Sequence, residues 1–146
     1  MAKNKEESQV TFSDEQIKHL EFIQDAITRM NSNSFQMKSW MLILVTALLG
    51  SFANTGNKNF VLLALLPTLI FWGLDTYYLQ LERKFRGVYN DVTGLAKEPK
   101  EIKLFAMPIN LYEGGKYSFG DVFLSVTILP LYLLVIGILL LIFFIV

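Results

Sequence analysis

The feature that most constrains this chain is its final stretch, residues 122–146, in which no side chain is charged. A helix needs about 20 mainly apolar residues to cross the roughly 30 Å hydrocarbon core of a membrane. Two further apolar blocks lie at about residues 35–53 and 60–81. The sequence therefore predicts an all-α membrane protein with three transmembrane helices. Burial of the first two blocks inside a soluble protein is the alternative.

The first two blocks are joined by the short polar segment 54–59, which predicts a tight turn and therefore an antiparallel hairpin. Ser13 followed by Gln16 has the pattern of a helix-capping box, and no proline or glycine interrupts residues 14–49. After the second block the chain stays compatible with a helix until Thr93 and Gly94. Both arms of the hairpin are thus expected to extend beyond the membrane into the cytoplasm.

This pattern divides the chain into four parts. A flexible tail is expected over 1–12, the extended hairpin over 13–94, a cytoplasmic connector over 95–117 and a C-terminal transmembrane helix over 118–146. The connector contains two prolines, two glycines and apolar residues interleaved with lysines, which suits a segment lying partly on the membrane surface.

The distribution of lysine and arginine predicts the orientation. Five of these residues precede or open the first span, one lies in the turn, and seven lie between the second and third spans. Because positive charge is enriched on the cytoplasmic side, the N-terminus and the connector should be cytoplasmic. The turn and the C-terminus should then be external.

The composition excludes several kinds of chemistry. There is no cysteine, so disulfides and thiolate metal sites are excluded, and His19 is the only histidine, which excludes a histidine-based metal site within one chain. Thirteen basic residues balance thirteen acidic ones, so no excess of positive charge points to nucleic acid. The chain also lacks a glycine-rich phosphate loop and a nucleophile elbow. We therefore expect neither a cofactor nor an enzymatic activity.

Lys38 and Asp75 are the charged residues of the first two blocks, and each lies 16 residues from an edge of the turn. At the helical rise both are about 24 Å from the turn and hence at about the same depth. Each side chain could simply reach the headgroups, or the two could form an ion pair that locks the hairpin or lines a conduction path. Since lysine reaches further than aspartate, loss of Asp75 is expected to disturb the protein more than loss of Lys38.

Two further groups are candidate functional residues. Asn31 and Asn33 could ring a pore mouth or bond between helices, although solvation of the helix surface is the commoner role of such amides. A second group lies at the cytoplasmic end of the second span and just beyond it, and could contact anionic lipid or a cytoplasmic phosphate or nucleotide. It comprises Arg83, Lys84, Arg86, Tyr77 and Tyr78.

Several short motifs resemble a widespread family of small, functionally uncharacterised bacterial membrane proteins. The resemblance covers roughly residues 15–95 and is carried by HLEFIQ (19–24), RM (29–30), NSF (33–35), KSW (38–40), FWGLDTYYL (71–79) and ER (82–83). The architecture is also similar to that of small transmembrane effectors of bacterial anti-phage systems. The resemblance implies location in the bacterial inner membrane.

Two functions remain open at this point. The first is a homo-oligomeric channel or membrane-disrupting effector, triggered by a cytoplasmic sensor protein or nucleotide signal and acting in anti-phage defence. The second is a non-conducting scaffold or accessory subunit that recruits a cytoplasmic partner. Both involve membrane lipids, and we expect a homo-oligomer because a three-helix monomer encloses no lumen.

Overall fold

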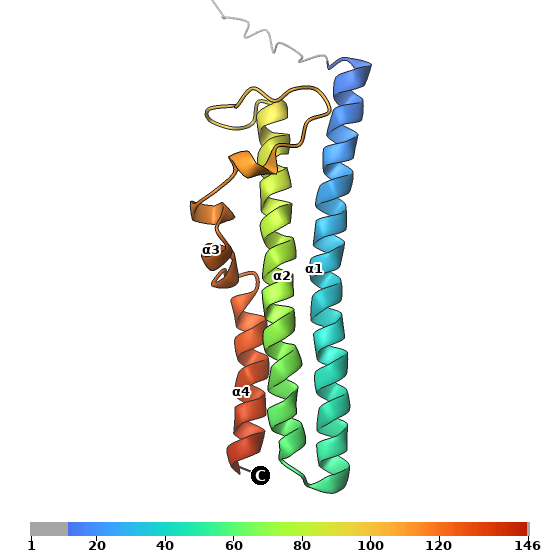
Figure 1. The fold of residues 1–146 in the computed structure, drawn as a ribbon, viewed down its shortest axis with the longest axis vertical. Helices are drawn as coiled ribbons and strands as arrows, with labels where there is room; N and C mark the ends of the chain where they lie inside the picture. Colours follow the sequence, from blue (N-terminus) through green and yellow to red (C-terminus); the bar gives the residue numbers. More distant parts are fainter. Residues whose placement is uncertain (1–11, 146) are drawn as a thin grey trace, which may run out of the picture.

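The computed structural model describes residues 12–145 as helices joined by turns and one irregular segment, with no strand among them. Two long helices, α1 (Asp14–Thr55) and α2 (Asn59–Val92), form an antiparallel hairpin. In Figure 1, α2 lies between α1 on one side and the C-terminal α4 (Leu129–Ile145) on the other. The expected tail falls outside the described residues, apart from residue 12.

The start and end of α1 have local causes. The Ser13 hydroxyl accepts from the Gln16 backbone N–H at 3.2 Å, and the Gln16 side chain accepts from the Ser13 N–H at 2.9 Å. The predicted capping box is thus confirmed. The helix then runs for 42 residues and ends where Gly56 adopts a left-handed conformation with φ of 67°. Glycine has no Cβ and adopts the left-handed conformation at little cost, so the turn closes within three residues.

The second helix ends where the sequence predicts, at Val92. Pro67 lies inside it without ending it. Both α1 and α2 are long and apolar enough to cross a membrane.

The third apolar block is not the single helix expected over 118–146. A short helix, α3 (Phe119–Phe123), is followed by a non-helical stretch before α4, which has 17 residues. The predicted cap is formed, because the Ser118 hydroxyl accepts from the Asp121 N–H, but it caps only α3. Pro130 explains the break: it has no N–H, and in a continuous helix its ring would clash with the carbonyl of Val126.

Two separate hydrophobic clusters hold the elements together. At the end containing the turn, α1, α2 and α4 pack through buried residues such as Met41, Val61 and Leu139. Trp72 stacks between Phe123 at 4.1 Å and Tyr132 at 5.5 Å, and so joins α2 to both sides of the break.

At the other end, Ile23, Ile27, Val88 and Tyr112 form the second cluster, joined by Ile102, Met107 and other half-buried connector residues. In water each fully buried aliphatic side chain contributes about 1.5–3 kcal/mol. The connector thus folds back onto the hairpin: Ile102 and Met107 pack against it, whereas Leu104 and Phe105 stay exposed.

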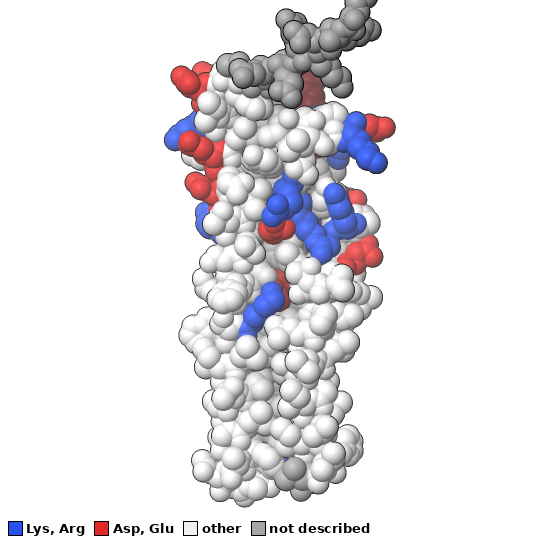
Figure 2. Space-filling view, turned by 180° about the vertical axis from the view of Figure 1, so that it is seen from behind, with Lys and Arg blue, Asp and Glu red and all other residues white. Residues whose placement is uncertain are grey.

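Charge divides the molecule into two ends. Residues 39–74 contain one charged side chain, Lys58 in the turn, and residues 122–146 contain none. In Figure 2 the charged side chains gather over the half that holds the start of α1, while the opposite half is white. We call these the charged end (14–37, 76–92 and the connector) and the apolar end (39–74 and α4).

Candidate functional site

Asp75 lies at the boundary between the two ends, with no part of its side chain exposed. The Lys38 ammonium is 2.7 Å from each of its carboxylate oxygens. Ser34 donates a hydrogen bond to Oδ1, and the Tyr132 hydroxyl donates to Oδ2 at 3.2 Å. The structure therefore brings the two charges of the hairpin together, and it surrounds them with hydroxyls from α1 and α4.

This polar cluster is closed, in that each of its members bonds to another member. Lys38 donates a hydrogen bond to Asp75 Oδ1, its ammonium also lies 2.7 Å from Oδ2, and it donates to the Ser34 hydroxyl at 2.9 Å. The Ser34 hydroxyl in turn donates to Oδ1. The Tyr132 hydroxyl is shared between Oδ2 at 3.2 Å and the Phe71 carbonyl at 3.3 Å. Both carboxylate oxygens of Asp75 therefore have partners among the described residues.

Helix geometry explains how the cluster assembles. Ser34 and Lys38 are four residues apart and therefore lie on one face of α1. The turn sets α1 and α2 in a register in which Lys38 opposes Asp75. Tyr132, one turn into α4, reaches the same level from the far side of α2.

Two members of the cluster are missed by the sequence analysis. Ser34 enters the sequence analysis only within the NSF motif, yet it is buried, and its spacing of four residues from Lys38 is a usable signal. Tyr132 belongs to a separate apolar block, and no sequence signal sets the register of that block against the hairpin.

The chemistry available to this cluster is narrow. A serine hydroxyl next to a lysine amine is an arrangement used for nucleophilic catalysis, but there the lysine must act as a base. Here Lys38 is ion-paired with Asp75, and the Ser34 side chain is buried. The geometry instead suits a rigid link between the three helices.

Asn31 and Asn33 do not join the cluster. Asn31 is exposed and Asn33 is half-buried, while the neighbouring Ser34 points inward. Neither amide side chain makes a hydrogen bond to another residue in the described part of the chain.

The second candidate group is spread over the surface of α2 instead of forming one site. Arg86 is ion-paired with Glu82, and Arg83 donates to the Lys116 carbonyl at 3.2 Å. Lys84 is half-exposed. The rings of Tyr77 and Tyr78 meet edge to face at 5.5 Å, with Tyr77 exposed.

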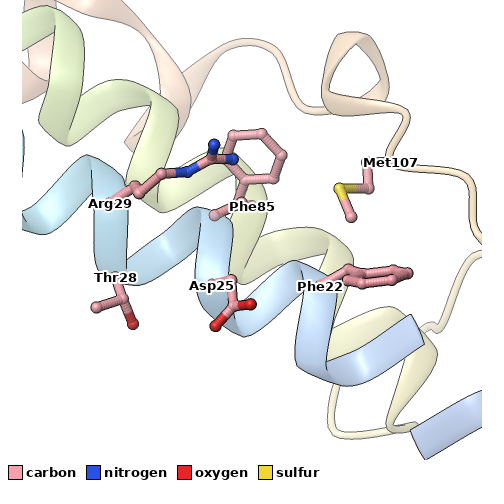
Figure 3. A pocket seen from close by; sticks show the side chains of 7 residues that line it. Phe22, Asp25, Thr28, Arg29, Phe85 and Met107 are labelled. Atoms are coloured by element: carbon pink, nitrogen blue, oxygen red, sulfur yellow. The ribbon is translucent and has the colours of Figure 1, made fainter. Parts of the chain in front are cut away.

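The charged end instead contains a cavity of about 640 Å3 between α1, α2 and the connector. Its lining residues are Phe22, Asp25, Ala26, Thr28, Arg29, Phe85 and Met107 (Figure 3). Of these, the sequence analysis includes Phe22 and Arg29 only within family motifs and Met107 only within the connector pattern. An apolar stripe on a helix gives no sign of whether another segment will cover it.

The connector is fastened to the hairpin by several polar contacts. Tyr112 donates to the buried Asp91 carboxylate, and burial, followed by this carboxylate, raises the pKa of Tyr112 above its ordinary value. The buried His19 ring nitrogen Nε2 is 2.9 Å from the Ala106 carbonyl, and Gln80 donates to the Tyr117 carbonyl at 2.8 Å. A Cβ on Gly87 would lie 2.6 Å from the Tyr112 ring, so the close approach of the connector requires glycine there.

Among residues 12–145, no group of three or more acidic or histidine side chains is placed to hold a metal ion. Comparison of the chain with protein-family models, with curated proteins and with solved structures gives no match.

Proposed function

We propose that this chain is a multi-pass protein of the bacterial inner membrane whose apolar end anchors a cytoplasmic platform that recruits a partner protein. The observation that carries the proposal is the enclosure of Asp75. Its side chain has no exposed surface, and its partners Lys38, Ser34 and Tyr132 come from the same chain. A carboxylate that is enclosed and ion-paired in this way suits a structural lock better than the lining of a pore.

The dimensions of the apolar end support membrane insertion. From Lys38 to Thr55, α1 extends about 26 Å at the helical rise, and the 17 residues of α4 extend a similar distance. These lengths are close to the roughly 30 Å hydrocarbon core. Lys38 and Asp75 would lie at its cytoplasmic edge, and the seven basic residues from Arg83 to Lys116 would lie beyond it.

The surface of the charged end supports recruitment of a partner. In the proposed orientation this end is in water, yet it exposes large apolar side chains. Exposed fractions are 47% for Ile17, 45% for Phe22, 73% for Leu95, 43% for Leu104 and 50% for Phe105. The rings of Phe22 and Phe105 lie 6.1 Å apart, and contiguous exposed apolar surface on a soluble protein marks interaction sites.

Cysteine accessibility tests the orientation. Because the chain has no cysteine, Asn57→Cys in the turn and Lys97→Cys in the connector each provide a single labelling site. With a membrane-impermeant maleimide, the residue 57 variant should be labelled in intact spheroplasts and the residue 97 variant only after lysis. Labelling of residue 97 in intact spheroplasts would overturn the proposed orientation.

Photo-crosslinking tests recruitment. A photoreactive phenylalanine analogue at Phe105 should yield a discrete adduct in cells, whereas the same analogue at exposed Glu98 should yield much less. Equal adduct formation at both positions would mean that the apolar surface selects no partner.

A homo-oligomeric channel, acting as an effector in anti-phage defence, is a second candidate favoured by a different observation. An apolar groove of about 410 Å3 runs between α1 and α2 at the apolar end, lined by Leu44, Ala47, Leu48, Leu63, Leu66, Pro67, Ile70 and Phe71. A helix of a second copy could fill it. Reconstituted vesicles separate the two candidates: the platform should give ion flux equal to that of protein-free vesicles, and the channel should give more.

A further inference from the structure

We infer that the cavity at the charged end binds a small amphipathic anion, with an aromatic or acyl body and one phosphate or carboxylate group. Its volume of about 640 Å3 lies within the usual range of about 300–1,000 Å3 for small-molecule sites. The site goes beyond the proposed platform function, and it depends on that function only for the cavity's access to the cytoplasm.

The apolar part of the ligand is indicated by the walls. Phe22 and Ala26 come from α1, Phe85 from α2 and Met107 from the connector. Figure 3 shows Met107 on the connector side of the space, facing the two helices. Aromatic rings and a methionine sulfur pack well against a flat or flexible apolar body.

The anionic part is indicated by Arg29. Within residues 12–145 it has no salt-bridge partner, unlike Lys18, Lys38 and Arg86. In Figure 3 its side chain extends toward Phe85, on the cavity side of α1. A guanidinium binds phosphate or carboxylate with two parallel hydrogen bonds, and such charge-assisted bonds are the stronger kind.

The acidic residue at the cavity does not oppose this assignment. Asp25 lies one helical turn before Arg29 and borders the same cavity, but the two side chains form no ion pair and leave α1 in different directions (Figure 3). An anion is therefore expected to bind on the guanidinium side of Arg29, away from the Asp25 carboxylate. Because the walls come from three segments, a bound ligand would also tie the connector to the hairpin.

The test uses purified protein in phosphatidylcholine nanodiscs and three probes: 1-naphthyl phosphate, 1-naphthol and inorganic phosphate. Naphthyl phosphate should bind with Kd below about 1 mM and more tightly than either part alone. Arg29→Gln should raise the Kd for naphthyl phosphate at least about tenfold and leave that for naphthol unchanged, because only the charge-assisted bonds are lost. Phe22→Ala should weaken the binding of naphthyl phosphate and of naphthol, because both contain the apolar ring.

Lys97→Gln is the control, since it removes one positive charge from an exposed side chain outside the cavity, and it should bind all three probes like the unmodified protein. Circular dichroism checks that each variant is folded. Equal affinity of Arg29→Gln and the unmodified protein would overturn the inference, as would equal losses of affinity in Arg29→Gln and Lys97→Gln. Binding of naphthyl phosphate no tighter than to empty nanodiscs would also overturn it. The titration does not depend on membrane orientation, so its failure would leave the proposed function standing.

Discussion

Replacing Lys38 or Asp75 with its neutral amide removes one charge of the pair and leaves the other in place. The side chain of Asp75 has no exposed surface, whereas 22% of the Lys38 side chain is exposed. After Asp75→Asn, the Lys38 ammonium can therefore move toward water and headgroups. After Lys38→Gln, the Asp75 carboxylate stays enclosed with only neutral donors. The structure thus reverses the order expected from side-chain reach alone.

The magnitudes follow from the burial of each remaining charge. Breaking a fully buried pair by removing one partner costs about 3–5 kcal/mol, and an exposed pair contributes about 1 kcal/mol or less. We expect Lys38→Gln to lower the free energy of unfolding by about 2–4 kcal/mol and Asp75→Asn to lower it by about 1–2 kcal/mol. The double variant should be more stable than Lys38→Gln, because it contains no unpaired charge.

Unfolding by dodecyl sulfate in mixed micelles, followed by circular dichroism, measures these differences. The exposed pair Lys18–Glu21 supplies the control: Lys18→Gln should leave the unfolding midpoint unchanged. The reasoning is refuted if Asp75→Asn destabilises the protein more than Lys38→Gln, or if the two effects add fully in the double variant.

Two further predictions concern the connector. Gly87→Ala places a Cβ against the Tyr112 ring and should destabilise the protein by about 1–3 kcal/mol and speed tryptic cleavage of the connector. Gly73→Ala, where a Cβ meets nothing within 4 Å, is the matched control and should leave the cleavage rate unchanged. Tyr112→Phe leaves the buried Asp91 without its donor and should cost about 1–3 kcal/mol by thermal unfolding. The raised pKa of Tyr112 means that the folded state holds this proton more tightly than the unfolded state. Its contribution to stability is full below pH of about 10 and falls as the pH rises above that, a loss that should be absent in Tyr112→Phe.

The hairpin could be predicted because its signals are local. The capping box at Ser13, the turn near Gly56 and the helix end at Val92 each depend on a few neighbouring residues. Equal spacing from the turn is then enough to place Lys38 opposite Asp75, since both helices rise by the same amount per residue.

The remaining features depend on contacts between distant segments. Tyr132 reaches Asp75 only because α4 packs on α2 in one register, which depends on the shapes of many side chains. The break before α4 had a visible signal in Pro130, but membrane helices often tolerate proline, as α2 does at Pro67. The cavity depends on how the connector folds back, and no periodic pattern encodes that path.

The closed polar cluster has a consequence for the order in which the protein can be made. Ser34, Lys38 and Asp75 all lie in the hairpin, whereas Tyr132 follows Asp75 by 57 residues. During synthesis the hairpin can therefore neutralise its own buried charges before α4 leaves the ribosome. The last helix then adds one hydrogen bond from a neutral hydroxyl to a site that is already ion-paired, so in the proposed membrane orientation its late arrival leaves no unpaired charge in the lipid while the chain is incomplete.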